Sequence, residues 1–259
     1  MTEAAPAGSS VTTSTLILVH GAWHRGACWA PLASALRDPA LTVLAPDLPG
    51  HGDDPLPRQQ VTLKRYVSSI VALLDAQPQP ITLLGHSMAG IIVSAAAALR
   101  PEKIARLIYL CAYLPGDGES VFDLIALNRQ HEPLTPIELA LEMSSDKRHC
   151  TVAAEQIIPL FYPQAAPQLA AAAQAAFGSQ ATLPLAAGAK LTGKAFAQLQ
   201  KTYICCTNDR VIPLHHQRRM LARQPCNTVL ILEADHCPFL SCPDILAHTL
   251  RDCLTASAH

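Results

Sequence analysis

Charged and aromatic residues are both scarce in this sequence. Of its 259 residues, 15% are charged and 5% are aromatic, and the 19 basic and 20 acidic side chains almost cancel to a formal charge of -1. Basic residues form no long run, the densest group being Arg218-Arg219 within a mixed segment. Proteins that bind nucleic acids or anionic membranes usually carry basic patches. The composition therefore argues against nucleic acid and against a membrane surface as partners.

Paired cysteines and long apolar runs are also missing. The nine cysteines are odd in number and none has the Cys-x-x-Cys spacing of a zinc site, so we expect thiols with structural roles and no metal. The longest apolar-rich stretch, residues 91–99, is too short to cross a bilayer. Residues 1–6 include an acid and lack the basic segment that opens a secretory signal. We therefore predict a soluble, cytoplasmic protein.

Short apolar runs without polar alternation recur along the chain, which is typical of strands covered on both faces of a parallel sheet. They lie at residues 16–19, 41–45, 81–84, 107–112, 202–206 and 228–232. Helical patterns fall between them, at residues 27–37, 63–76, 88–99, 214–223 and 243–254. This alternation predicts an α/β fold with a mostly parallel sheet and helices on both faces. Loops at the carboxyl ends of the strands should then carry the chemistry.

The alternation is interrupted once, between residues 115 and 193. Apolar residues there follow helical spacing, and prolines at 133, 136, 159, 163, 167 and 184 divide the segment into short helices. We predict an inserted helical cap at 115–193 and a core made of 15–114 and 194–259. Residues 1–14 are small, polar and aperiodic, so we expect a flexible leader there.

A serine lies where one buried strand turns into a helix. Ser87 is flanked by small residues in the segment GHSMAG, residues 85–90. A sharp strand-to-helix turn lifts the serine hydroxyl above the sheet and needs small neighbours, because backbone and side chains crowd there. The usual pattern is Gly-x-Ser-x-Gly, so Ala89 is a departure, followed at once by Gly90. The segment predicts the nucleophile of an α/β-hydrolase fold, against the alternative of a serine that caps an ordinary helix.

A serine nucleophile needs a histidine base that is itself oriented by a carboxylate. In this fold the chain order is nucleophile, acid, histidine. Asp209 follows the strand at 202–206 and His236 follows the strand at 228–232, so both lie in carboxyl-end loops in the required order. Asp117, after the strand at 107–112, is the second candidate for the acid. Asp235 is adjacent to His236, and we expect it to brace the loop.

The tetrahedral intermediate of acyl transfer needs two backbone N–H donors for its oxyanion. One should come from Met88, the residue after the nucleophile, and the other from Ala22, in the loop after the first strand. His20 and His86 should organise the floor of the site through hydrogen bonds.

At this point the chain resembles a known family. The segments that carry the resemblance are LILVHGAWHRGACW at 16–29, DLPGHG at 47–52, GHSMAG at 85–90, DRVIP at 209–213 and DHCPFLS at 235–241. They are similar to those of the α/β-hydrolase branch that contains plant methylesterases, hydroxynitrile lyases and bacterial esterase relatives. The resemblance covers nearly the whole chain outside the predicted cap, and it implies a hydrolase fold without metal or organic cofactor.

The resemblance implies either ester hydrolysis or lyase chemistry. Hydroxynitrile lyases of this branch have His-Thr after the first strand and a lysine directly after the catalytic histidine; here Gly21 and Cys237 occupy those positions. A cysteine thiol lacks the permanent charge that cyanide release uses. Esterase chemistry is therefore favoured, with a hydroxynitrile-type lyase and a non-enzymatic small-molecule receptor as alternatives.

The predicted partner is a small to medium, uncharged, hydrophobic carboxylic ester, and no other partner is indicated. Lactones, amides and thioesters stay open, as does the oligomeric state, a homodimer included. Residues that could line an apolar substrate pocket are Trp23, Phe122, Leu124, Ile125, Phe161, Tyr162 and Leu183.

Overall fold

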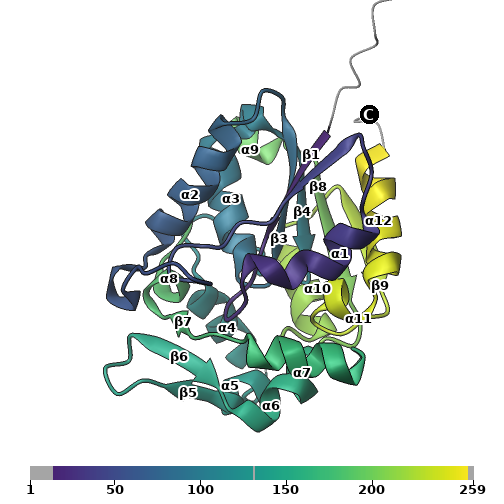
Figure 1. The fold of residues 1–259 in the computed structure, drawn as a ribbon. Coiled ribbons are helices and arrows are strands. Elements are labelled where there is room, and N and C mark those ends of the chain that lie inside the picture. The colour runs from purple at the N-terminus through teal and green to yellow at the C-terminus, as the bar shows by residue number, and fades with distance from the viewer. Residues whose placement is uncertain (1–13, 131, 256–259) are drawn as a thin grey trace, which may run out of the picture.

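The central sheet has six strands, all paired in parallel (Figure 1). The computed structural model describes residues 14–130 and 132–255. In it the strands are β1 (Ser14–Val19), β2 (Leu41–Leu44), β3 (Ile81–His86), β4 (Ile104–Leu110), β8 (Lys201–Cys206) and β9 (Thr228–Leu232), in the order β2-β1-β3-β4-β8-β9. All six predicted strands are present. The predicted leader lies outside the described residues except for Ser14, which opens β1.

Burial separates the central strands from the edges. β3 is buried along its whole length, whereas β2 and β9 are largely half-buried or exposed. On β9, Val229 is 47% exposed and Ile231 is 62% exposed. The prediction that all six runs are covered on both faces was therefore wrong for these two, because an edge strand lacks a neighbour and is covered less completely.

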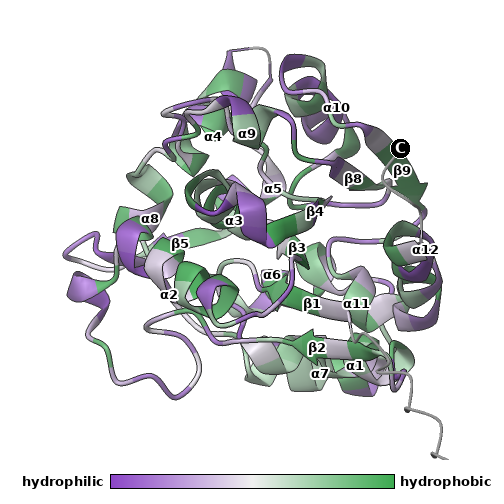
Figure 2. Cartoon of the chain, turned by 90° about the horizontal axis from the view of Figure 1, so that it is seen from above, coloured by the Kyte–Doolittle hydropathy of each residue, from purple (hydrophilic) through white to green (hydrophobic). Residues whose placement is uncertain are grey.

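Helices cover both faces of the sheet (Figure 2). α2 (Leu63–Asp75) and α3 (Ala89–Leu99) pack together on one face, and α1 (Ala30–Ala35) and α12 (Pro243–Thr255) pack together on the other. α10 (Leu214–Arg223) contacts β8, and α11 (Pro238–Ser241) precedes α12. Short 3₁₀ turns are η1 (Gly26–Trp29), η2 (Arg58–Gln60) and η3 (Pro101–Lys103). α3, which begins just after Ser87, is buried nearly all round, so the nucleophile turn rests on a rigid element.

Most of the segment between β4 and β8 lies beyond one end of the central sheet, whereas its last helix, α9, lies at the opposite end in contact with α3 and η3 (Figure 1). It contains α4 (Val121–Arg129), α5 (Pro136–Ala140), β5 (Leu141–Met143), β6 (His149–Val152), α6 (Ala154–Phe161), α7 (Pro167–Ala175), β7 (Gln180–Ala181), α8 (Leu183–Ala186) and α9 (Lys194–Ala197). β5, β6 and β7 form a small antiparallel sheet that the prediction of helices alone missed. These strands are only two to four residues long, too short for a visible alternation.

No helix in residues 14–130 and 132–255 is long and apolar enough to cross a membrane.

Candidate active site

Ser87 lies in a strained turn between β3 and α3. Its φ is +55°, in the left-handed region that a non-glycine residue occupies at a cost of order 1–3 kcal/mol. The Ser87 N–H donates to the Leu110 carbonyl at 3.3 Å, and the Ser87 carbonyl accepts from Gly90 at 3.1 Å and from Tyr113 at 3.0 Å. These bonds hold the strained backbone against β4 and the loop that follows it.

The space around the turn explains its glycines. A Cβ at Gly90 would lie 1.9 Å from the Tyr113 carbonyl oxygen, and one at Gly21 would lie 2.8 Å from Ser87 Cβ. A methyl group is already accommodated at Ala89, which is fully buried. The alanine that departs from Gly-x-Ser-x-Gly is therefore at Ala89, where a methyl group fits. The next position, Gly90, has no room for one.

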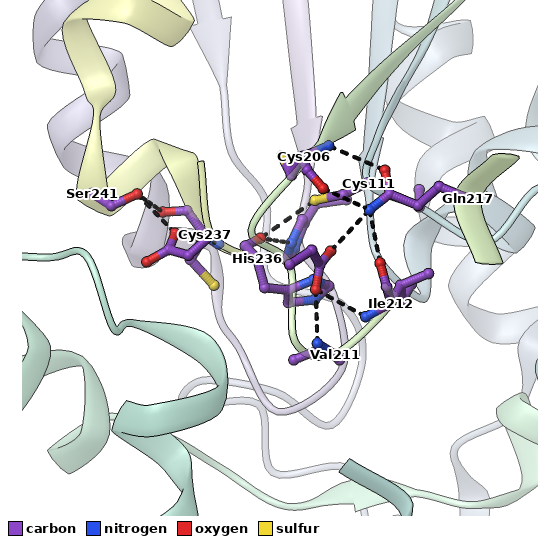
Figure 3. A network of polar contacts seen from close by, with 12 residues as sticks. Cys111, Cys206, Val211, Ile212, Gln217, His236, Cys237 and Ser241 are labelled. Carbon is purple, nitrogen blue, oxygen red and sulfur yellow. Dashed lines mark hydrogen bonds and ion pairs between the residues drawn. The ribbon is translucent and has the colours of Figure 1, made fainter. Parts of the chain in front are cut away.

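A buried hydrogen bond joins the predicted acid and base. His236 Nδ1 lies 2.8 Å from Asp209 Oδ2, and both side chains are fully buried. Asp209 Oδ1 accepts the N–H groups of Val211 at 2.7 Å and Ile212 at 2.8 Å. Gln217 on α10 donates to the Ile212 carbonyl at 2.7 Å and lies 3.4 Å from Asp209 Oδ2 (Figure 3). The Asp209 carboxylate is thus held in one orientation toward the imidazole.

The other nitrogen of the imidazole, Nε2, is available to accept a proton. His236 Nε2 is buried and makes no hydrogen bond within the described part of the chain. His86, the residue before Ser87, contacts the His236 ring at a centroid distance of 4.6 Å and donates through Nε2 to the His236 carbonyl at 2.8 Å. Burial is the main cause that lowers the pKa of His86 well below its usual value, and the nearby His236 lowers it further. A neutral His86 therefore ties the serine turn to the histidine loop.

The two rival carboxylates bond elsewhere. Asp235 accepts from Cys237 N at 3.1 Å, from Ser241 Oγ at 2.8 Å and, in the β4–β8 segment, from Gln164 N at 3.1 Å. Burial raises the pKa of the Asp235 carboxyl. Asp117 accepts from Leu191 N at 2.7 Å. Both aspartates brace loops, and neither hydrogen-bonds the His236 ring.

The loop after β1 is fixed by two histidines. His20 donates from Nδ1 to the Gly21 carbonyl at 2.8 Å and accepts from Leu48 N through Nε2 at 3.0 Å. In a trans peptide the C=O and N–H point in opposite directions, so this bond also orients the N–H of Ala22. His24 binds the Ala22 carbonyl at 2.8 Å, and burial lowers the pKa of His24 to about 4.

A small apolar cavity opens over Ser87. Its volume is about 60 Å³, and its lining includes Ala22 and Met88. In the turns and loops of residues 14–130 and 132–255, neither Ala22 nor Met88 donates its N–H to a backbone acceptor. The cavity holds only about four water molecules at ~15 Å³ each. Binding of an organic ester therefore requires the lining to move.

Three of the seven predicted pocket residues line this cavity: Trp23, Phe122 and Ile125. The other four lie elsewhere: Leu124 and Phe161 are buried in packing, Tyr162 lines a different cavity and bonds His24 through its hydroxyl, and Leu183 is 48% exposed. That second cavity, of about 260 Å³, lies beyond Trp23 and does not include Ser87.

Other residues on the Ser87 cavity were not predicted. They include Tyr113, Ile137, Met143, Cys150, Thr182 and Val211. Most come from the short elements between β4 and β8, where no motif or periodicity distinguishes a lining side chain from a packed one.

A metal does not fit the buried groups beside the base. His86, Cys111 and His236 offer ligand atoms within 4.8 Å of one another. However, His86 Nε2 is bonded to a carbonyl, and burial raises the pKa of the Cys111 thiol well above its usual value. A protonated thiol is a poor ligand, since metals bind the thiolate.

Comparison with known proteins identifies the family of the chain. Residues 16–249 match the Alpha/beta hydrolase family, and the chain belongs to it. A pyrethroid hydrolase of Sphingobium wenxiniae is 30% identical over 257 residues, covering 96% of this chain and 90% of the relative. Methylesterase 7 of Arabidopsis thaliana is 26% identical over 257 residues, which cover 91% of this chain and 94% of the relative. The crystal structure of a pyrethroid hydrolase from Sphingobium faniae JZ-2 aligns with a TM-score of 0.79 at 26% identity. The alignment covers 93% of this chain and 97% of that structure.

Proposed function

We propose that the protein hydrolyses carboxylic esters through an acyl-enzyme on Ser87. The observation that carries this proposal is the buried hydrogen bond between Asp209 and His236. His236 Nε2 has no hydrogen-bond partner among the described residues, and His86 bonds the His236 carbonyl and so links the histidine loop to the serine turn. His236 takes the Ser87 proton as the hydroxyl attacks the ester carbonyl, then protonates the leaving alcohol. Water repeats the sequence on the acyl-enzyme and releases the acid.

The oxyanion of the tetrahedral intermediate is assigned to the amides of Ala22 and Met88. Both residues line the cavity that holds Ser87, and the peptide N–H of Ala22 is oriented by the His20 bond to Gly21. Removing one such donor in a serine hydrolase typically costs about 10²–10³ in rate.

The substrate class follows from the lining of the cavity. The lining of the Ser87 cavity includes one carboxylate, Glu138. It forms an ion pair with Arg129 at 2.6 Å and accepts hydrogen bonds from Thr135, so this lining presents no unpaired charge to the substrate. We infer small to medium, uncharged, hydrophobic esters. The names of the relatives, a pyrethroid hydrolase and a methylesterase, support ester substrates. Residues 115–193 are assigned as the cap that admits and selects them.

Lyase chemistry of the hydroxynitrile type is disfavoured by the residue after His236. Cys237 is fully buried, and burial raises the pKa of its thiol well above the usual value. A neutral thiol offers no positive charge to departing cyanide.

The decisive experiment identifies the nucleophile. A fluorophosphonate probe should label Ser87, and Ser87→Ala should lose at least about 10³-fold in kcat on p-nitrophenyl butyrate. Ser68→Ala, an exposed serine on α2, serves as the matched control and should retain activity. Release of cyanide from a cyanohydrin without ester hydrolysis, or turnover unaffected by Ser87→Ala, would overturn the proposal.

A further inference from the structure

Two histidines and a glutamate converge away from Ser87. His215 and His216 lie in the first turn of α10, and Glu132 follows α4 in the β4–β8 segment. Glu132 Oε2 lies 2.5 Å from His215 Nε2 and 2.9 Å from His216 Nε2. The three ligand atoms all lie within 4.8 Å of one another. The cluster joins parts of the chain more than 80 residues apart.

This set of atoms suits a divalent transition metal. Two imidazole nitrogens and one carboxylate oxygen form a donor set that zinc sites use, with metal bonds of about 2.0–2.2 Å. Ligand atoms in a tetrahedral site of that size lie about 3.3 Å apart. The present spacings of 2.5 and 2.9 Å therefore need to open by less than ~1 Å, with each imidazole proton on Nδ1.

The surroundings hold Glu132 and His216 in place and leave His215 exposed. Glu132 is anchored through its other oxygen, Oε1, which accepts from Arg219 at 2.8 Å; Arg219 also donates to Asn128 at 2.6 Å. Hydrogen bonding of this kind orients ligating carboxylates in metal sites. The His216 side chain is 5% exposed and the His215 side chain 56% exposed, so one ligand is fixed and the open side faces solvent. The Arg219 charge weakens the affinity for a cation without occupying the site.

We propose that Glu132, His215 and His216 bind a zinc-class divalent cation that joins the β4–β8 segment to α10, with solvent as the fourth ligand. This departs from the sequence-based expectation of no metal, which rested on cysteine spacing and on the family resemblance. Ligands brought together from separate segments leave no such spacing.

A metal bound at Glu132, His215 and His216 should affect the active site through α10. Gln217, the next residue on this helix, bonds the Ile212 carbonyl and Cys206 beside Asp209 (Figure 3). A metal that ties the segment to this helix restrains the movement that a cavity of about 60 Å³ needs to admit an ester. This consequence rests on the proposed function, whereas metal binding does not. We expect zinc to lower kcat/KM more for bulky esters than for small ones.

The test is calorimetric titration of the EDTA-treated full chain with zinc. We expect one zinc per chain, with the affinity reduced at least ~tenfold in His215→Ala and in Glu132→Gln, each of which removes one ligand. His248→Ala is the matched control, because His248 is exposed on α12 near Asp252, outside the cluster. Its zinc affinity should equal that of the unmodified chain. Zinc should raise the melting temperature of the unmodified chain and of His248→Ala, but not of His215→Ala.

The Ser87→Ala variant should bind zinc with unchanged affinity. Zinc binding is therefore tested independently of the proposed esterase activity. The proposal is overturned if the unmodified chain binds no zinc, or if His215→Ala and Glu132→Gln bind it as tightly. Zinc held at the cysteines or at His236 would give that second result.

Discussion

The choice between two aspartates can be tested by changing one atom in each. Asp209 accepts hydrogen bonds from the His236 imidazole and from two backbone amides. Asp235, next to His236, accepts from Cys237, Ser241 and Gln164 instead. Asparagine replaces one acceptor oxygen with a donor and keeps the shape of the side chain. Asp209→Asn and Asp235→Asn are therefore a matched pair.

In Asp209→Asn the amide oxygen can keep the two backbone donors, so the amide nitrogen faces His236 Nδ1. The imidazole must then carry its proton on Nε2, which removes the lone pair that would accept the proton of Ser87. A wrong tautomer of this kind costs about 10⁴ in kcat. That factor corresponds to about 5.4 kcal/mol of transition-state stabilisation, at about 1.36 kcal/mol for each tenfold step.

In Asp235→Asn the new amide nitrogen faces the N–H of Gln164, and this partly buried hydrogen bond is lost. The cost falls on stability, about 0.5–1.5 kcal/mol, while kcat should stay within about tenfold of the unmodified enzyme. The assay combines kcat on p-nitrophenyl butyrate with urea unfolding of both variants. An Asp209→Asn enzyme within tenfold of the original kcat, or a folded Asp235→Asn enzyme as inactive as Asp209→Asn, would refute this assignment.

Three further outcomes are expected. Because the pKa of His24 falls from 6.5 unfolded to about 4 folded, the unfolded chain binds the extra proton. As pH falls from 6.5 to 4, His24 alone should lower the stability by about 3 kcal/mol, so urea unfolding of His24→Gln should show a drop smaller by about that amount. Gly90→Ala places a methyl group 1.9 Å from the Tyr113 carbonyl and should destabilise by about 3 kcal/mol in the same measurement, whereas equal stability would contradict the crowding. Trp23→Ala removes a side chain shared by both cavities and should raise the kcat/KM ratio of bulky to small esters about tenfold; an unchanged ratio would exclude Trp23 as a size filter.

Local pattern was sufficient for the elements of the core. Apolar runs and the helical periods between them indicated all six strands, because each strand consists of consecutive apolar residues, at the edges of the sheet as well as in its centre. The strand-turn-helix around Ser87 is equally local, since its small residues are required by contacts within a few positions and with the adjacent strand. The sequence could not distinguish edge strands such as β9 from central ones, because strand order follows from long-range pairing.

The sequence by itself determined the family fold, the serine at its turn and the order of candidate acid and base. Only the tertiary structure decided which carboxylate bonds the imidazole, since Asp117 and Asp209 both follow strands and differ only in where their loops converge. It also decided which side chains reach the cavity and that Glu132 meets two histidines of α10. These contacts join residues far apart in the chain, and their distances exist only after the sheet and the segment between β4 and β8 have packed together.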